Sequence, residues 1–489
     1  MGDRSIGNPG WKLEATYASL PGDFFQELPP QTVREPELLL LNEGLAQDLG
    51  LDAAWLRSGE GLAVLAGNAL PADSRPLAQA YCGHQFGHFT MLGDGRAILI
   101  GEQRDAQGSL WDLQYKGSGR TPYSRGGDGR AALKPMLREF LISEAMHGLG
   151  IPTTRSLAVV ATGEEVLRQT GPEPGAVMLR VASSHLRVGT FQYAAAKGNA
   201  ALSQALLGYA IARHYPACAA AKNPAEAFLE AVIQAQAGLI ARWMLVGFIH
   251  GVMNTDNMTI SGESIDYGPC AFMDAYYPQT VFSSIDHHGR YAYGNQPSIA
   301  QWNLARLAET LLPLLSEDEQ KALALANASL RSFGDAYRAA WLAGMRGKLG
   351  LANAHGDDQA LCDDFLEILL QQGRDFTNSF RDLSLWLQAG SCPEAALAPW
   401  FARWQERIAS EGGRLEQVRA RMARHNPRLI PRNHRVEEAL EQAEAGNWQA
   451  WDHLLAHLRQ PYGEAEVPPG LAEPVPEHLA AVYQTFCGT

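Results

Sequence analysis

The sequence predicts an α+β protein with two lobes, an N-terminal extension and a large helical C-terminal region. Short apolar runs typical of strands are concentrated between residues 81 and 200. Longer runs with helical periodicity dominate from about residue 201, and a polar cluster interrupts them at 245–270. We therefore expect four parts, which are the extension (1–80), a β-rich lobe (81–200), a helical lobe (201–325) and the C-terminal helices (326–489).

Composition and charge exclude several classes of function. The 489 residues are 46% hydrophobic and 19% charged, so the chain can bury a sizeable core. The formal net charge of −13 argues against binding to nucleic acid or to anionic membranes. The apolar helix expected near 226–249 contains Glu230 and Arg242, which argues against a membrane span. We expect a cytoplasmic, monomeric protein without nucleic-acid or membrane partners.

Short elements precede a predicted hairpin in the first quarter of the chain. Residues 1–80 are rich in proline and contain short helical runs such as 37–49, and we expect them to pack on the β-rich lobe. An apolar run over 97–103, a turn at 105–108 and an alternating run over 110–116 then predict a β-hairpin. The β-rich lobe therefore begins with two antiparallel strands.

Two glycine-rich segments lie in the β-rich lobe, one before the hairpin and one before a helix expected over 130–149. Glycine lets backbone N–H groups approach a phosphate closely, although a glycine turn alone is more often an ordinary tight turn. The first segment contains Gly93, Gly95 and Arg96, and the second contains Asp128 and Gly129.

Charged residues in apolar surroundings add to this interpretation. Lys116 ends the second strand of the hairpin, and Glu139 lies beside the apolar face of the following helix, where it could reach a strand lysine. Arg180 and Arg187 bracket a further apolar strand and must find anions if they are buried. Salt bridges to protein carboxylates would satisfy each arginine alone. Together with two glycine segments, the two arginines favour a phosphate-binding site.

The polar cluster at 245–270 is a candidate metal site. Asn257 follows an apolar run, a strand-like run over 258–260 comes next, and Asp266 lies shortly beyond it. Carboxylate and amide oxygens are ligands that magnesium and manganese prefer. A solvated turn with an Asx cap is the alternative for such a sequence. The second acid on the following segment favours a metal site.

The order of these parts is that of a protein kinase: glycine loop, strand with lysine, helix with glutamate, then asparagine and aspartate ligands. His250 and Asn257 match the first and last positions of the kinase motif H-R-D-x-x-x-x-N. Val252 replaces the aspartate that accepts the hydroxyl proton in kinases, and Asp256 is the acid in this loop that could take over as base. A dead kinase, an atypical phosphotransferase and other ATP chemistry all remain open at this point.

Longer segments resemble one family specifically. YCGHQFGHFTMLGDGRA at 81–97, LRVASSHLRVGTF at 179–191, GFIHGVMNTDNM at 247–258 and IDYGPCAFMD at 265–274 are similar to the selenoprotein O family, also called YdiU. The resemblance runs through most of the chain and is densest from 81 to 300. In some family members a selenocysteine stands near the C-terminus, where this chain has Cys487.

The resemblance implies a kinase-like fold that binds ATP in inverted orientation and transfers AMP to Ser, Thr or Tyr hydroxyls of proteins, releasing pyrophosphate. It implies Asp256 as proton acceptor, Asn257 and Asp266 as ligands of Mg²⁺ or Mn²⁺, and an ion pair between Lys116 and Glu139. The nucleotide contacts implied by the resemblance are Gly93, Gly95, Arg96, Lys116, Asp128, Gly129, Arg180, Arg187 and Asp266. A kinase-like phosphotransferase and a non-catalytic pseudokinase scaffold are the alternatives.

Overall fold

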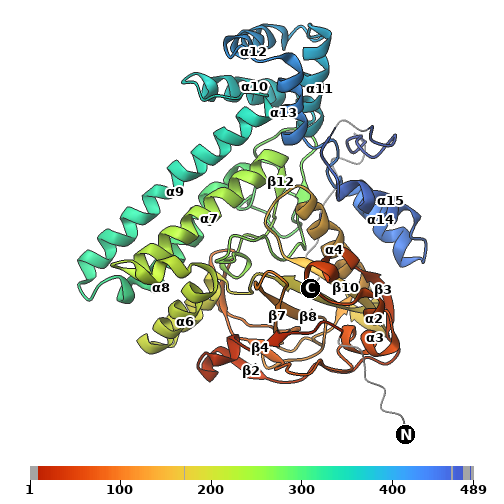
Figure 1. Ribbon diagram of the computed structural model, residues 1–489, viewed down its shortest axis with the longest axis vertical. Helices are drawn as coiled ribbons and strands as arrows, with labels where there is room; N and C mark the ends of the chain where they lie inside the picture. The colour runs from red at the N-terminus through yellow and green to blue at the C-terminus, as the bar shows by residue number, and fades with distance from the viewer. Residues whose placement is uncertain (1–8, 170, 464–465, 477–484, 486–489) are drawn as a thin grey trace.

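The two predicted lobes are present in the computed structural model, which describes residues 9–169, 171–463, 466–476 and 485. A strand-rich lobe occupies the lower part of Figure 1, and long helices extend above and to the left of it. The expected α+β class with a helical C-terminal region is confirmed. Cys487 lies outside the described residues.

One large antiparallel sheet forms the core of the strand-rich lobe (Figure 1). Its main path is β2 (Phe25–Glu27), β4 (Leu77–Gln79), β7 (Ala97–Arg104), β8 (Leu110–Lys116), β11 (Gly171–Ala182), β10 (Arg155–Arg168) and β3 (Glu37–Leu41). Two short strands pair beside this path, β1 (Leu13–Glu14) with β7 and β9 (Ala131–Ala132) with β11. The predicted hairpin is confirmed as β7–β8, with Ala97 opposite Lys116.

The N-terminal extension differs from its expected structure. Residues 37–41 were expected to be helical, but they form β3, which pairs with β10 at the edge of the sheet. Only Glu43–Asp48 is helical, as α1, and Asn42 caps it by accepting a hydrogen bond from the Leu45 N–H. A leucine run fits either structure locally, so the distant partner strand decides. The first 80 residues thus complete the sheet, and α2 (Ala53–Leu56) and α3 (Gly59–Leu65) cover one of its faces.

Helix α4 (Leu133–Gly148) packs against β10 and β11 and carries Glu139. It is buried along most of its length because the sheet covers one side and C-terminal helices cover another. A small hairpin, β5 (Cys82–Gln85) and β6 (His88–Met91), lies outside the large sheet and contacts the loop that contains Asp256. This hairpin therefore connects the strand-rich lobe to the helical lobe.

The helical lobe is built from α5 (Val188–Ala196), α6 (Ala200–His214), α7 (Pro224–Val246), α8 (Gln296–Leu315) and α9 (Glu319–Lys348). By length and composition, α7 could cross a membrane, but 61% of its most apolar 18-residue window is buried inside the protein. It packs on α8 and α9 and forms part of the core. Burial against these helices explains its apolar composition.

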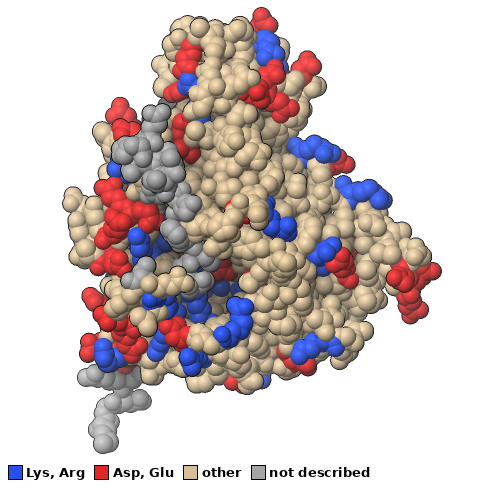
Figure 2. Space-filling view, turned by 180° about the vertical axis from the view of Figure 1, so that it is seen from behind, with Lys and Arg blue, Asp and Glu red and all other residues tan. Residues whose placement is uncertain are grey.

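The C-terminal helices form two groups. At the end of α9 lie α10 (Asp358–Gln372), α11 (Phe376–Ala389), α12 (Ala398–Ser410) and α13 (Leu415–His425), and α14 (Asn433–Glu444) with α15 (Gln449–Leu458) returns to the outer side of α4 (Figure 1). Acidic and basic side chains alternate around a broad uncharged area on the face shown in Figure 2. The net negative charge is therefore not gathered into one patch on that face.

Candidate active site

The loop between α7 and the segment 266–268 differs in detail from the predicted metal hairpin. Residues 258–260 form no strand, and Thr259 makes an isolated bridge to Arg187. The antiparallel pair is instead β12 (Phe248–Ile249) with β13 (Ala271–Phe272), which encloses the whole loop. Thr255–Asn257 forms a single 3₁₀ turn. The loop is thus closed by strands at its base.

His250 and Gly251 give this loop its shape. The His250 ring hydrogen-bonds through Nε2 to the Ile265 carbonyl at 2.8 Å, which ties the loop to the segment that carries Asp266. Gly251 has a φ of 82°, and a Cβ there would lie 2.6 Å from the Pro269 carbonyl oxygen. The arginine that kinases carry at this position is therefore excluded by the close approach of the backbone.

Three cations converge on Asp266. Lys116 Nζ donates to Asp266 Oδ1 at 2.8 Å, Arg180 Nη1 donates to the same oxygen at 2.7 Å, and Arg187 Nη1 lies 3.9 Å from Oδ2. Lys116 also donates to Glu139 at 2.5 Å, which confirms the predicted ion pair, and Arg180 lies 3.3 Å from the same carboxylate. Three buried cations thus share two carboxylates, which leaves an excess of positive charge.

The electrostatics of Asp266 follow from this arrangement. Burial alone would raise its pKa, but Lys116, Arg180 and Arg187 hold the pKa of Asp266 well below its ordinary value. Asp266 has a φ of 62°, a left-handed conformation that is uncommon for residues other than glycine. Such conformations often occur at functional sites, where the surrounding structure maintains them.

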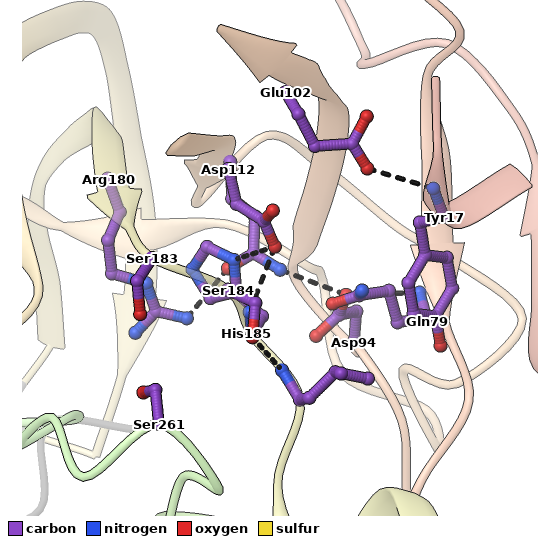
Figure 3. Close-up of polar contacts among 12 residues, drawn as sticks. Tyr17, Gln79, Asp94, Glu102, Asp112, Arg180, Ser183, Ser184, His185 and Ser261 are labelled. Atoms are coloured by element: carbon purple, nitrogen blue, oxygen red, sulfur yellow. Dashed lines mark hydrogen bonds and ion pairs between the residues drawn. The ribbon is translucent and has the colours of Figure 1, made fainter. Parts of the chain in front are cut away.

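Further polar contacts position Arg180. Arg180 Nη2 donates to Gln114 Oε1 at 2.7 Å, and Gln114 Nε2 donates to Asp94 Oδ2 at 3.0 Å. Asp94 also accepts the Gln79 backbone N–H at 3.0 Å, and burial raises the pKa of Asp94 to about 6. Figure 3 shows Arg180, Asp94 and Gln79 in this buried polar region of the sheet. The guanidinium is therefore fixed from two sides.

A second network positions Arg187. Asp112 on β8 accepts the His185 backbone N–H at 2.9 Å and lies 3.1 Å from the ring Nδ1 (Figure 3). The His185 carbonyl accepts a hydrogen bond from Arg187 Nε at 3.3 Å. The Arg187 guanidinium also lies 4.3 Å from the centroid of the Tyr81 ring and donates to the Asp256 carbonyl at 3.3 Å. Arg187 thus links the sheet to the loop of Asp256.

Asp256 is buried, and its Oδ1 has no hydrogen-bond partner among the described residues. Burial raises the pKa of Asp256 to about 6, although the nearby Arg187 charge and a hydrogen bond from Gln85 both lower it. A carboxylate with a pKa close to neutrality is suited to accept a proton. Asp256 is therefore a buried acid with one oxygen that has no partner among the described residues.

Asn257 and Asp266 fit a divalent metal in their chemistry. The Asn257 Nδ2 donates to the Val252 carbonyl at 3.0 Å, which leaves Oδ1 as its ligand atom. Asp266 is kept ionised and its side chain is 24% exposed, against 9% for Lys116. No group of three or more His, Cys, Asp or Glu side chains placed to hold a metal occurs among the described residues. Two oxygen ligands suit Mg²⁺ or Mn²⁺, which take further ligands from water and phosphates.

The glycine segments contact each other in this structure. A Cβ on Gly93 would collide with the Tyr123 ring, a Cβ on Gly95 would lie 3.0 Å from the Tyr123 carbonyl, and a Cβ on Gly129 would collide with the Gly119 backbone. Asp128 forms an ion pair with Arg168 at 2.9 Å. Burial raises the pKa of Asp128, but the bond from Arg168 and the charge of Arg96 contribute to a net lowering. Asp94, between Gly93 and Gly95, connects the first segment to Arg180 through Gln114.

Sequence reasoning missed several residues of the site. Gln114 fixes Arg180, Tyr81 stacks on Arg187, and Gly83 and Gln85 contact Asp256. One available signal was the alternation in β8, which puts Gln114 on the same face as Lys116. The other three lie at 81–85, where the sequence offers no periodicity that points toward Asp256.

Comparison with known proteins decides the family. The family model described as "Protein adenylyltransferase SelO" matches residues 10–459 of this chain. The chain belongs to the SelO family. Proteins named "Protein nucleotidyltransferase YdiU" from Shouchella clausii and Geobacillus kaustophilus are each 56% identical to it, covering 98% of this chain and 99% of the relative. One of the same name from Alkaliphilus metalliredigens is 53% identical over 99% of both chains.

Membership of the SelO family confirms the expected fold and enzyme class, a kinase-like protein adenylyltransferase. A nucleotidyltransferase needs a site for a triphosphate, which agrees with the excess of buried positive charge around Asp266. The pseudokinase scaffold is therefore set aside as an interpretation of this chain.

Proposed function

We propose that this protein transfers AMP from ATP to Ser, Thr or Tyr hydroxyl groups of other proteins, with Mg²⁺ or Mn²⁺ as cofactor. The observation that carries the proposal is the convergence of Lys116, Arg180 and Arg187 on Asp266. Arginine binds phosphate oxygens through two donors at once, and these two arginines are nearly inaccessible to water. A phosphate chain that reached them would find its charge neutralised at the buried end of the site.

The position of these cations favours transfer of AMP over transfer of the γ-phosphate. In the inverted orientation implied by the family, the β- and γ-phosphates contact Lys116, Arg180 and Arg187. An acceptor hydroxyl oxygen then attacks the α-phosphorus, and the bond from that phosphorus to the oxygen of the β-phosphate breaks. Pyrophosphate leaves with its negative charge stabilised by the buried cations.

Asp256 accepts the proton of the attacking hydroxyl in this proposal. It is the acid of the loop, it has a free oxygen among the described residues, and Val252 occupies the position of the kinase base. Asn257 and Asp266 would hold the metal ion, which supplies further charge neutralisation at the phosphates when it is bound. Asp256 and Asp266 therefore have different roles and are separable by mutation.

The glycine segments complete the proposed nucleotide site. Gly93, Gly95 and Arg96 precede β7, which pairs with β8, and Asp128 with Gly129 lies in the segment between Lys116 and α4. Gly117 N–H donates to the Arg96 carbonyl at 2.8 Å, which places the first segment next to that lysine. We assign these five residues to contacts with the nucleotide.

We further propose that the enzyme acts in the cytoplasm as a monomer on protein substrates. Its five described cysteines are all free thiols, as is usual in a reducing compartment. Sedimentation of the purified protein tests the monomer, since a stable dimer would double the mass. Fractionation of the producing cells tests the compartment.

One labelling experiment tests the activity. The protein is incubated with an acceptor protein and ATP labelled at either the α- or the γ-phosphate. Incorporation of the α label alone supports transfer of AMP, whereas incorporation of the γ label alone would identify a kinase. Asp266→Ala should abolish incorporation through loss of the metal. Asp256→Ala should slow it by about 100-fold or more with nucleotide binding largely retained, as expected for loss of a general base. Normal turnover in the Asp256 variant would refute its role as base.

A further inference from the structure

A groove opens beside the catalytic loop, on the side of the β5–β6 hairpin. Its cavity has a volume of about 540 Å³ and lies between the hairpin tip, the segment 285–290 and the start of α8. A second cavity of about 420 Å³ continues along α8 toward α9, and Ser298 lines both. We call the first cavity the acceptor groove; it is lined by Phe86, His88, Ile285, Asp286, His287, His288, Arg290, Asn295, Ser298 and Ile299.

The acceptor groove carries a cation without a carboxylate partner. Arg290 Nε has no hydrogen-bond partner in the described part of the chain, and no carboxylate there lies within ion-pair distance of its guanidinium. The guanidinium lies 4.9 Å from the centroid of the Trp302 ring, which holds it in place without neutralising it. The one acid of the lining, Asp286, accepts the backbone N–H groups of Arg290 and Tyr291 at 2.9 and 2.7 Å. Its charge is therefore engaged by the backbone.

Apolar side chains lie next to this cation. Ile285 is 47% exposed in the groove, and Phe89 and Met91 on the adjoining strand β6 are 49% and 50% exposed. Phe86 at the hairpin tip has a φ of 50° and packs its ring against Tyr291, with centroids 5.1 Å apart. Exposed apolar groups gathered next to a catalytic loop are typical of a surface that binds another protein.

Both walls of the groove are fastened to the loop of Asp256. The Phe86 N–H donates to Asn254 Oδ1 at 3.0 Å, and the Tyr291 hydroxyl donates to the same oxygen at 2.6 Å. Gln85, the neighbour of Phe86, contacts Asp256 directly. A chain lying in the groove would therefore pass within a few residues of the proposed base.

We propose that the acceptor groove binds the protein that receives AMP, through an extended segment with an acidic side chain near its target hydroxyl. The acidic side chain pairs with Arg290, and an apolar neighbour packs on Phe86 and Ile285. The choice of an acidic segment rests on charge complementarity, because Arg290 is a preorganised cation that lacks a carboxylate partner among the described residues. This inference rests on the proposed AMP transfer and names the class of substrate.

Matched peptides test this preference. Three sets of nine-residue peptides share a central Ser, Thr or Tyr and one isoleucine, and differ only in flanking Glu, Gln or Lys. Transfer of α-labelled AMP should show a kcat/KM at least tenfold higher for the Glu set than for the Gln set, and lowest for the Lys set. Arg290→Glu should invert the order. The control variant is Arg338→Glu, which changes an exposed arginine on α9 outside the groove. It should keep the wild-type order of kcat/KM for the three peptide sets.

Direct binding separates the groove from the chemistry. Fluorescent peptides with Ala in place of the acceptor residue are titrated with the protein, and the Glu peptide should bind more tightly to the wild type than to Arg290→Glu. Equal binding and equal transfer of the Glu, Gln and Lys peptides, or a preference for the Lys peptide, would refute the proposed role of the acceptor groove. The proposal of AMP transfer would be unaffected by that result. Selective binding of the Glu peptide without any incorporation of α label would instead support the groove and refute the proposed activity.

Discussion

The backbone of Gly83 lies directly on the carboxylate of Asp256. A Cβ built on Gly83 would lie 2.6 Å from Asp256 Cγ, closer than a real side chain could come. The hairpin strand β5 is held there by the His84 N–H, which donates to Thr255 Oγ1 at 2.7 Å. The position of the proposed base is therefore set by a glycine on a different lobe.

Gly83→Ala should reduce the rate of AMP transfer by at least about 100-fold, because the added methyl group displaces Asp256 or lifts the hairpin. Binding of ATP should change little, since the atoms nearest a Cβ on Gly83 belong to Asp256 and not to Lys116, Arg180 or Arg187. Single-turnover transfer and nucleotide titration measure the two effects. Gly208→Ala in α6, where a Cβ meets nothing within 4 Å, is the matched control. Full activity of Gly83→Ala would show that the contact is not needed.

Gln114→Leu should impair catalysis with ATP more strongly than it impairs binding of the acceptor peptide. The leucine removes the acceptor of Arg180 Nη2 and one of the two donors to Asp94 Oδ2, and leaves both groups buried without that bond. We expect kcat/KM for ATP to fall by about tenfold, with the KM for the acceptor peptide nearly unchanged. Gln114→Glu supplies an acceptor to Arg180 but no donor to Asp94, and should retain more activity. If both variants were as active as the wild type, Gln114 would have no role in the active site.

Arg138→Met should destabilise the link between α4 and the C-terminal helices. Arg138 donates to the Gly268 and Cys270 carbonyls at 3.2 and 2.7 Å, and to Asn433 and Glu437 at 3.0 and 2.9 Å. Loss of these bonds in a buried site should lower the free energy of unfolding by roughly 2–5 kcal/mol. Thermal unfolding measures this effect. Lys134→Met, which breaks a partly exposed ion pair to Glu437, should cost less than about 1 kcal/mol.

Lys348→Met should stabilise the protein near neutral pH. Lys348 is fully buried, with Nζ 4.1 Å from the Phe380 ring centroid, and burial lowers its pKa to about 7 from 10.5. The unfolded chain keeps this proton up to about pH 10.5, whereas the folded protein releases it near pH 7. Because of Lys348, the free energy of unfolding of the wild type therefore increases as the pH rises from about 7 to about 10.5.

The methionine variant lacks that dependence on pH. Its advantage over the wild type should be roughly 2–4 kcal/mol near pH 7, at about 1.4 kcal/mol per pH unit, and should shrink toward pH 10. Denaturant unfolding at pH 7 and pH 9.5 measures the difference. If Lys348→Met exceeded the wild type in free energy of unfolding by the same amount at pH 7 and pH 9.5, the pKa of Lys348 would not be lowered in the folded protein.

Local patterns in the sequence predicted the parts of the site that depend on local structure. The β7–β8 hairpin and the α4 helix follow from periodicity, and together they bring Lys116 to Glu139, a separation of 23 residues. The helix expected at 37–41 was wrong because β3 forms there, and its partner strand β10 lies more than 100 residues away. The convergence of Lys116 and Arg180 on Asp266 joins residues 150 and 86 positions apart, and no local pattern records it.

The bond from Arg138 to Glu437 joins residues 299 positions apart, and this separation has a consequence for synthesis. At about 5–20 residues per second, a ribosome delivers α14 roughly 15–60 s after α4. During that interval the outer side of α4, which packs on α14 and α15 in the finished protein, lacks these contacts. An incomplete chain therefore exposes the outer side of α4 until α14 and α15 have been made.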